Sequence, residues 1–277
     1  MSDTWINGQQ GTLVNSSNRG LTYGDGVFAT MRIDDGGCIQ FFDAHCSRLE
    51  QGSQRLKFFD GEDFWKITPS SILLIKQLAK ENPNRGIKFL LTRGEGGRGY
   101  APSQNAQYTE IITIFDLPDH YKGWQSQGVS LSISEVKLAN QPLLAGIKHL
   151  NRLEQVLIKS VLLPDGFDDW LVLDPNNNVA ESSMANIFAF IDGVWCTPVM
   201  SNCGVSGVMR EQVLMALPEM NHPVSVTEIS INSLMCAKYV FITNSLFGVV
   251  AIKKINQQLF DMWDGVNSLR NSLGVTL

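Results

Sequence analysis

The sequence predicts an α+β fold divided into two domains. The chain has 277 residues, which is enough for two compact domains that each bury a core. Stretches with strand-like alternation and stretches with helix-like spacing follow one another, and no internal repeat is present. A polar, turn-forming stretch at 116–124 interrupts this pattern, as interdomain linkers do. We therefore expect a smaller domain at 1–115, a linker at 116–127 and a larger domain at 128–277.

Composition and charge narrow the class of protein. Apolar residues make up 44% of the chain and charged residues 18%, which argues against disorder. The net charge is −5 without a long basic run, so we expect neither nucleic acid nor a membrane surface as partner. The start of the chain lacks the basic and apolar regions of a signal peptide. Five scattered cysteines indicate reduced thiols and no zinc site, so we expect a cytoplasmic protein.

The first half of the chain predicts strands, helices and two glycine-rich stretches. Gly24-Asp25-Gly26 is typical of a tight turn, because it lacks the full spacing of a nucleotide fingerprint. His45 has no ligand-spaced partner, which favours packing over metal binding. We expect a strand and turn at 4–8, strands at 87–91 and 110–115, a helix from an Asp43 cap to about Lys57, and a helix from Thr68-Pro69 onward.

The second glycine-rich stretch, 93–100, follows the strand at 87–91. Four of its eight residues are glycine, which excludes a regular element. It also carries Arg93, Arg98 and Tyr100, and a guanidinium binds a carboxylate through two parallel hydrogen bonds. An anion-binding loop and an ordinary surface loop are equally compatible with this pattern.

The second half predicts short strands and a helix that begins near glycine. Val129, Leu131 and Ile133 alternate with serines, as in a half-buried strand. Ser206 is the expected N-cap of a helix to about Leu217, whose exposed amides would suit a phosphate. Further strands are expected at 170–173, 178–180, 186–191 and 239–243.

A lysine precedes another predicted helix. Asn151 is the expected N-cap and Glu154 its capping-box partner. Lys148 would lie near the positive helix end and Arg152, which would lower the amine pKa toward that of a nucleophile. An ordinary solvated lysine remains the alternative. The apolar residues that we expect this helix to bury are Leu153, Val156, Leu157 and Val161.

Three of these stretches together resemble the fold-type IV pyridoxal-phosphate enzymes, the family of branched-chain and D-amino-acid aminotransferases. They are Gly-Gly-Arg-Gly-Tyr at 96–100, Ala-Gly-Ile-Lys-His-Leu-Asn-Arg-Leu-Glu-Gln at 145–155, and Gly-Val-Ser-Gly-Val-Met-Arg at 204–210. The resemblance covers essentially the whole chain. It implies two α/β domains with mixed and antiparallel sheets, and pyridoxal 5′-phosphate as cofactor.

The resemblance also implies roles for individual residues. Lys148 would attach the cofactor covalently, and Glu181 would keep its pyridine nitrogen protonated. The residues implied for the phosphate are Arg48, Gly207, Val208 and Ser245. Those implied for the substrate are Thr30, which would face the reacting atoms, Arg98, Tyr100 and Asn244. Ala29 departs from some similar members, which carry a second threonine there.

The match is nearest to members that eliminate pyruvate from 4-amino-4-deoxychorismate. The expected product is 4-aminobenzoate, a folate precursor, with Lys148 as the base and Arg98 as the group that orients the substrate. The family also implies a homodimer in which one subunit's small domain closes the other's site. The alternatives are an aminotransferase for D- or branched-chain amino acids and a catalytically silent cofactor-binding protein. The Arg98 loop and the context of Lys148 favour the elimination.

Overall fold

The computed structural model describes residues 3–103 and 106–277. Met1 and Ser2, on which the expectation of no signal peptide partly depends, lie outside the described residues. The chain forms two compact units. The N-terminal unit comprises residues 1–117 and 147–151, and the C-terminal unit comprises residues 118–146 and 152–277. The short segment 147–151 therefore belongs with the N-terminal unit although both of its flanks belong to the other one.

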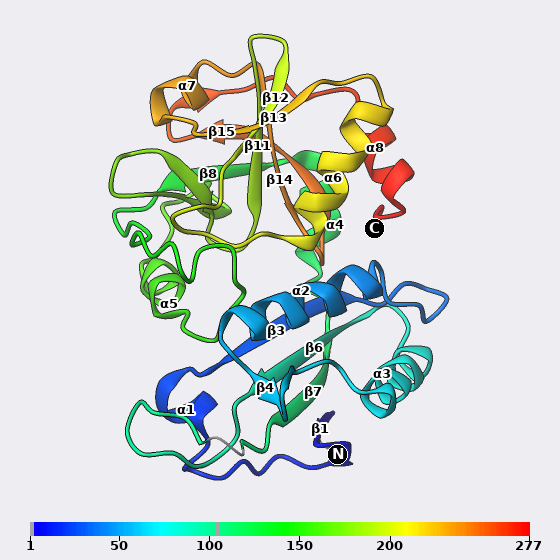
Figure 1. The fold of residues 1–277 in the computed structure, drawn as a ribbon. Helices are drawn as coiled ribbons and strands as arrows, with labels where there is room; N and C mark the ends of the chain where they lie inside the picture. The colour runs from blue at the N-terminus through cyan, green and yellow to red at the C-terminus, as the bar shows by residue number, and fades with distance from the viewer. Residues whose placement is uncertain (1–2, 104–105) are drawn as a thin grey trace. The chain divides into compact units, whose positions relative to one another are not determined.

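The N-terminal unit is built on an antiparallel sheet with the strand order β2-β1-β7-β6-β3 (Figure 1). The predicted strands at 4–6, 87–91 and 110–115 are confirmed. The predicted turn after the first strand is also confirmed, since Asn7 and Gly8 both have positive φ. The strands are β1 (Thr4–Ile6), β2 (Gln9–Gln10), β3 (Gly26–Arg32), β6 (Arg85–Thr92) and β7 (Thr109–Asp116), with a separate hairpin of β4 (Phe59–Asp60) and β5 (Asp63–Phe64).

The helices of this unit confirm one prediction and correct another. Helix α3 (Pro69–Glu81) begins as predicted, since Thr68 Oγ1 accepts the amide of Ser71 at 3.1 Å. Helix α2 (Phe42–Arg55) does not have Asp43 as its cap, because the N-cap is Phe41 in a left-handed conformation and Asp43 lies in the first turn. Helix α1 (Arg19–Tyr23) was not predicted.

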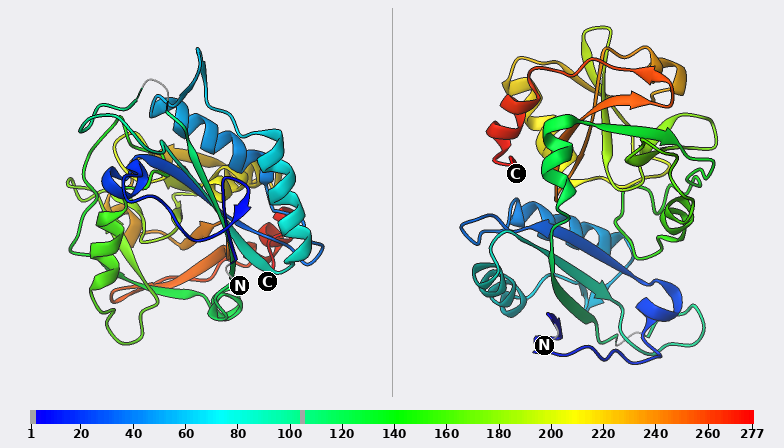
Figure 2. Two further views of the ribbon diagram at one scale, coloured as in Figure 1. Left: turned by 90° about the horizontal axis from the view of Figure 1, so that it is seen from below. Right: turned by 180° about the vertical axis from the view of Figure 1, so that it is seen from behind.

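The core of the N-terminal unit lies on one face of the sheet. Alternate residues of β3, Val27, Ala29 and Met31, are buried there against Leu49 of α2 and Ile75 of α3. Both views of Figure 2 show α2, in blue, running along β3. The intervening positions of β3 point to the opposite face, which carries candidate site residues.

The C-terminal unit contains a mixed sheet, so the predicted α+β class with antiparallel and mixed sheets is confirmed. The pairs β8–β9, β8–β15 and β12–β13 are parallel. In sheet order the strands are β10 (Val179–Ser182), β9 (Asp169–Leu173), β8 (Val129–Ile133), β15 (Gly248–Ile255), β14 (Tyr239–Asn244), β11 (Asn186–Ile191), β12 (Val194–Pro198) and β13 (Val224–Thr227), and β16 (Gln258–Leu259) pairs with β15.

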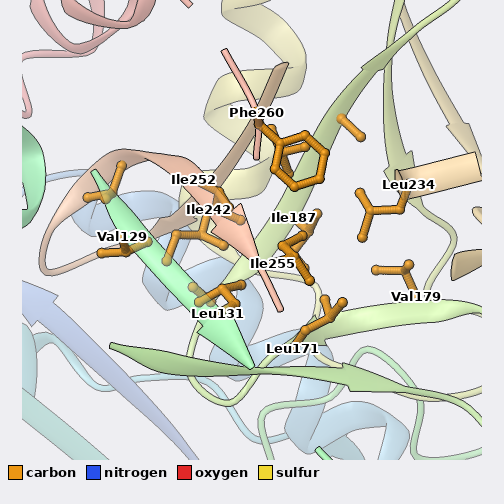
Figure 3. Packing of buried hydrophobic residues seen from close by; sticks show 14 of the residues in the cluster. Val129, Leu131, Leu171, Val179, Ile187, Leu234, Ile242, Ile252, Ile255 and Phe260 are labelled. Atoms are coloured by element: carbon orange, nitrogen blue, oxygen red, sulfur yellow. The ribbon is translucent and has the colours of Figure 1, made fainter. Parts of the chain in front are cut away.

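The buried core of this unit explains why β8 differs from its prediction. Ser130 and Ser132 are 2% and 9% exposed, so β8 is buried on both faces and not half-buried. Parallel neighbours on both sides account for this, since parallel strands are usually covered on both faces. Figure 3 shows Val129 and Leu131 packing among side chains from β9, β14 and β15.

The helices of the C-terminal unit are α4 (His120–Gln127), α5 (Leu153–Ser160), α6 (Val208–Glu219), α7 (Ile231–Met235) and α8 (Val266–Leu273). Helix α4 occupies most of the stretch expected to be an irregular linker. Its Gln125 is buried and donates to the carbonyls of Phe247 and Val275, which ties the helix to the unit. No helix in the described ranges is long and apolar enough to span a bilayer.

The predicted cap and buried face of α5 are both wrong. Asn151 donates instead to the carbonyl of Gly24, and Glu154 accepts the amide of Ala139. The helix begins at Leu153 without a side-chain cap. Of its residues only Ile158 is buried. The residues expected to be buried are exposed: Leu153 by 70%, Val156 by 59%, Leu157 by 49% and Val161, just past the helix, by 52%.

Candidate active site

The backbone of Lys148 is fixed against the edge of the N-terminal sheet. The amide of Phe28 donates to the carbonyl of Lys148 at 2.9 Å, and the amide of Leu150 donates to the carbonyl of Gly26 at 2.9 Å. Residues 147–151 thus continue the sheet beyond β3 as a short antiparallel addition. This pairing explains why the segment belongs to the N-terminal unit.

On the face of β3 opposite the core, the amines of Lys148 and Lys88 both lie close to the ring of Phe28. Lys148 Nζ lies 4.6 Å from the centre of the Phe28 ring, and Lys88 Nζ lies 5.1 Å from the same point. Thr30 is two residues beyond Phe28 on β3 and pairs in register with Lys88 of β6. The side chains of Phe28, Thr30 and Lys88 therefore lie on the same face of the sheet. Burial lowers the pKa of Lys88, and no ion pair to it is found within residues 3–103 and 106–277. The arrangement offers positive charge beside Thr30.

Helix α2 contributes Arg48 and a neutral histidine to the same region. His45 is fully buried, and both of its ring nitrogens lack a hydrogen-bond partner in the described part of the chain. Its pKa is well below the ordinary histidine value, first because of burial and then because Arg48 and Lys148 are positively charged nearby. The expected packing role of His45 is consistent with this burial. The structure therefore brings Arg48, His45 and Lys148 together within one unit.

Glu181 is a buried carboxylate at the end of β10. It is 6% exposed, and its Oε2 accepts the amide of Val205 at 3.0 Å. A register shift between Val179 and Glu181 interrupts the pairing of β10 with β9, and such bulges redirect a side chain. Glu181 also raises the pKa of Arg152, although burial of Arg152 has the larger, opposite effect. Ordered surroundings of this kind keep a carboxylate in one orientation.

The segment that begins α6 lies against Glu181 and Asn186. Ser206 is not the N-cap as predicted, because the helix starts after Gly207 and no side chain caps it. Asn186 Nδ2 donates to the carbonyl of Val205 at 2.8 Å, and its Oδ1 occupies the position that a Cβ on Gly207 would need. Glycine at 207 thus permits this close approach. The uncapped amides of the first turn, including Val208, form a positive helix end.

Four further candidate residues lie in or next to turns. Asn244 accepts the amides of Leu246 and Phe247 and donates to the carbonyl of Met184, so its side chain holds the turn that contains Ser245. Arg98 and Tyr100 lie in the loop after β6, where both are exposed. The predicted irregular conformation of this loop is confirmed.

Comparison with known proteins settles the family of this fold. The family model described as amino-transferase class IV matches residues 26–255. The chain belongs to this family. A curated relative, the aminodeoxychorismate lyase of Vibrio harveyi, is 37% identical over 254 residues, which are 91% of each chain. A putative branched-chain-amino-acid aminotransferase of Methanocaldococcus jannaschii is 26% identical over 246 residues, 88% of this chain and 83% of the relative.

A solved structure extends the likeness to three dimensions. The crystal structure of 4-amino-4-deoxychorismate lyase from Pseudomonas aeruginosa matches with a TM-score of 0.87 and 31% identity. The match covers 98% of this chain and 97% of the other. The predicted fold-type IV architecture is thereby confirmed.

The residues of this chain fit pyridoxal 5′-phosphate, the cofactor of the amino-transferase class IV family to which it belongs. A buried carboxylate suits a protonated pyridine nitrogen, and Glu181 is such a group. A helix start whose first amides have no side-chain cap suits a phosphate, and the first turn of α6 after Gly207 is such a start. Within the N-terminal unit, Lys148 carries an amine and Arg48 a guanidinium, the types of group that covalent attachment and phosphate binding require.

Sequence reasoning missed Lys88, Asn186 and Arg210. Lys88 could have been noticed as the one charged residue in the apolar strand prediction 87–91. Asn186 carries no local signal, because its role depends on Val205 and Gly207 from a distant part of the chain. Arg210, within the third family stretch, is buried and donates to Thr197 and the carbonyl of Pro198, so it anchors α6.

Proposed function

We propose that this protein is a 4-amino-4-deoxychorismate lyase, which releases pyruvate and forms 4-aminobenzoate for folate synthesis in the cytoplasm. The observation that carries the proposal is the 37% identity to the V. harveyi lyase across 91% of both chains. The M. jannaschii aminotransferase is more distant, at 26%. The Gly-Gly-Arg-Gly-Tyr loop at 96–100 supports the same assignment.

The proposed cofactor contacts are those that the family resemblance implies, and the geometry within each unit supports them. Lys148 would attach the cofactor, and Glu181 would accept a hydrogen bond from its protonated ring nitrogen. Arg48 through its guanidinium, Gly207 and Val208 through their amides, and Ser245 through its hydroxyl would hold the phosphate. When bound, pyridoxal phosphate supplies an electron sink for the carbanion that proton removal generates.

The protein's own residues move the proton and orient the substrate. We propose that the neutral amine of Lys148 removes the proton from the ring carbon that bears the substrate nitrogen. Loss of this proton allows the enol ether bond to break, so that pyruvate leaves and the ring becomes aromatic. Only the unprotonated form of an amine can take up a proton, so this mechanism requires Lys148 to be neutral when the substrate binds. Thr30 is placed on the face of β3 where Lys148 lies and would contact the reacting atoms.

The substrate carries carboxylates, which we assign to cationic side chains. Arg98 can form two parallel hydrogen bonds to one of them. Lys88 offers a second, partly buried positive charge beside Thr30. The ring of Tyr100 can line the same substrate. These contacts would hold the leaving group in position for elimination.

The decisive experiment compares elimination with amino transfer. Purified protein loaded with pyridoxal phosphate is incubated with 4-amino-4-deoxychorismate, and both pyruvate and 4-aminobenzoate are quantified. The same protein is incubated with D-alanine or leucine and a keto acid. We expect equal amounts of the two elimination products and little amino transfer. Faster transamination than pyruvate release would replace the lyase with an aminotransferase.

We also propose a homodimer. Helix α5 exposes Leu153, Val156 and Leu157 side by side at helical spacing, and the loops around it expose Leu143 and Leu162 by 80% and 92%. Contiguous exposed apolar residues of this kind favour a protein interface. Sedimentation at assay concentration should give twice the mass of one chain. A fully active monomer would contradict the proposal.

A further inference from the structure

One buried ion cluster lies at the base of the loop that carries Arg98. Asp25 Oδ2 accepts a hydrogen bond from Arg19 Nε at 2.9 Å and another from Arg93 Nε at 2.8 Å. The side chains of Arg19, Asp25 and Arg93 are only 6%, 15% and 10% exposed. Arg93 uses its other donors on the carbonyls of Leu56 and Lys57. The cluster therefore joins α1, the end of β6 and the end of α2.

From α1, Arg19 extends from this cluster to the part of the loop around Arg98. Its guanidinium donates to the carbonyl of Gly99 at 3.1 Å, to that of Tyr100 at 3.0 Å and, at a longer 3.4 Å, to that of Gly96. These carbonyls lie on both sides of Arg98 in the chain. The amide of Arg19 also donates to the carbonyl of Gly94 at 2.7 Å. One arginine thus holds both arms of the loop.

Further hydrogen bonds also restrain the loop, among them one from Ser17 Oγ to Glu95 Oε2 at 3.3 Å and one from the amide of Ala101 to the carbonyl of Arg98 at 3.2 Å. Gly94, Gly96, Gly97 and Gly99 all have positive φ, and glycine has no strong preference for this conformation over others. A hollow of about 570 Å³ is bordered by residues of the loop, of α1 and of the segment that precedes α1. The lining residues are Ser17, Arg19, Thr22, Tyr23, Glu95, Gly96, Gly97 and Gly99.

An aromatic contact reinforces the hydrogen bonds of Arg19. The Tyr23 and Tyr100 ring centres are 5.4 Å apart, and the Arg19 guanidinium carbon lies 4.8 Å from the Tyr23 ring centre. Both contacts are within the usual range for aromatic and cation–π attraction. Tyr23 is 40% exposed, so this contact lies at the protein surface.

We propose that Arg19 is a positioning residue that sets the conformation of loop 93–101 and thereby the place at which Arg98 meets a substrate carboxylate. The role of Arg98 in this statement depends on the proposed lyase function. The hydrogen bonds by which Arg19 restrains the loop do not depend on the proposed function. A substitution at Arg19 should therefore act on substrate binding through Arg98 and leave the cofactor residues unaffected.

The test compares wild type with Arg19→Lys in the full-length, cofactor-loaded protein. Lysine keeps a positive charge for Asp25 but cannot supply the planar fork that reaches several carbonyls. We expect KM for 4-amino-4-deoxychorismate to rise about tenfold, the effect of losing one charge-assisted hydrogen bond. The kcat and the absorption spectrum of the bound cofactor should stay as in wild type.

Limited proteolysis gives a readout that is independent of activity. Trypsin cleaves after arginine, and Arg98 lies in the exposed loop. Mass spectrometry should show faster cleavage after Arg98 in Arg19→Lys, because the released loop fits the protease more easily. Arg85→Lys is the matched control. Arg85, like Arg19, is ion-paired, in its case with Asp3 and Asp116, but it lies at the opposite end of β6.

A double variant distinguishes positioning from a general structural defect. If Arg19 acts through Arg98, Arg19→Lys should change kcat/KM by less than about twofold in an Arg98→Ala background. Should Arg19→Lys fail to fold, Tyr23→Ala at the surface tests the same contact and should shift cleavage and KM in the same direction. Wild-type cleavage and wild-type KM in these variants would overturn the proposal. If wild type releases no pyruvate, the lyase assignment fails, while the cleavage rates still decide whether Arg19 holds the loop.

Discussion

The proposed cofactor residues and the proposed substrate loop are held in opposite ways. Glu181 is 6% exposed and receives the amide of Val205, while Gly207 is fitted against Asn186. Tyr100, in contrast, is 87% exposed on a loop that Arg19 holds through backbone carbonyls. Buried, packed groups keep one geometry, whereas an exposed loop can be altered without disturbing the core. Changes in the first region should therefore affect the cofactor, and changes in the second should affect substrate binding.

The largest expected effect tests the cofactor region. Lys148→Ala should abolish the visible absorption band of the lysine-bound cofactor and nearly all turnover, because no other amine is assigned to attach it. The spectrum and the rate of pyruvate release are measured on the same preparation. Lys137→Ala, an exposed lysine that bonds Asn177 in the C-terminal unit, is the control. Near-normal activity of Lys148→Ala would remove the lysine from the mechanism.

Glu181→Gln sharpens the comparison by keeping the shape of the side chain. Glutamine can still accept the amide of Val205, but it cannot hold the pyridine nitrogen protonated. We expect the cofactor to remain bound and turnover to fall by about two orders of magnitude, similar to the loss of a general acid. Glu211→Gln, on the exposed side of α6, should have no such effect. Unchanged turnover in Glu181→Gln would mean that another residue meets the nitrogen.

Arg98→Ala tests the exposed region. Loss of one charge-assisted contact typically costs about 1.5–3 kcal/mol, which lowers kcat/KM by roughly ten- to a hundredfold. The spectrum of the cofactor should stay intact, and Arg98→Lys should lose less. A spectral change in Arg98→Ala would break the division between the two regions.

The smallest expected effect concerns pH and the buried His45. Its pKa is lowered in the folded protein, so below about pH 6.5 the unfolded chain binds a proton that the folded chain does not. The contribution of neutral His45 to the free energy of unfolding is therefore fully present above that pH. It decreases below that pH, by up to about 1.4 kcal/mol per pH unit. His45→Asn should lose less stability than wild type between pH 7 and 5, as measured by denaturant midpoints. His120 is exposed, so His120→Asn should lose as much stability as wild type over this pH range. An equally reduced loss in His120→Asn would show that His45 is not the cause.

Helices α3 and α5 show how far local sequence patterns predict this fold. Thr68 caps α3 as expected, because its partner is only three residues away. The same pattern fails at α5, where Asn151 and Glu154 bond to Gly24 and Ala139 from other parts of the chain. Periodicity located the apolar stripe of α5 correctly but could not show which surface it faces. A local sequence pattern does not show that distant backbone groups compete for the side chains expected to cap the helix.

The candidate site was predicted through the family resemblance more than through local chemistry. Lys148 alone is indistinguishable from a solvated lysine, and the three family stretches gave it a role. The resemblance named Arg98 but not Arg19, whose importance rests on bonds to carbonyls that any residue type could provide. Because every residue has a backbone carbonyl, the sequence does not indicate which carbonyls accept hydrogen bonds. The hydrogen bonds from Arg19 to the loop could therefore be identified only from the structure.

The place of Lys148 at the open edge of β3 has a consequence for synthesis of the protein. The N-terminal unit leaves the ribosome first, but its segment 147–151 follows only after 118–146 have been made. Until then the edge of β3 presents unpaired amides and carbonyls, which favour pairing with other chains. A nascent chain that stalls before Ile147 is therefore both inactive and prone to aggregate. The lysine that we propose as the catalytic base is synthesised as part of the segment that pairs with this edge.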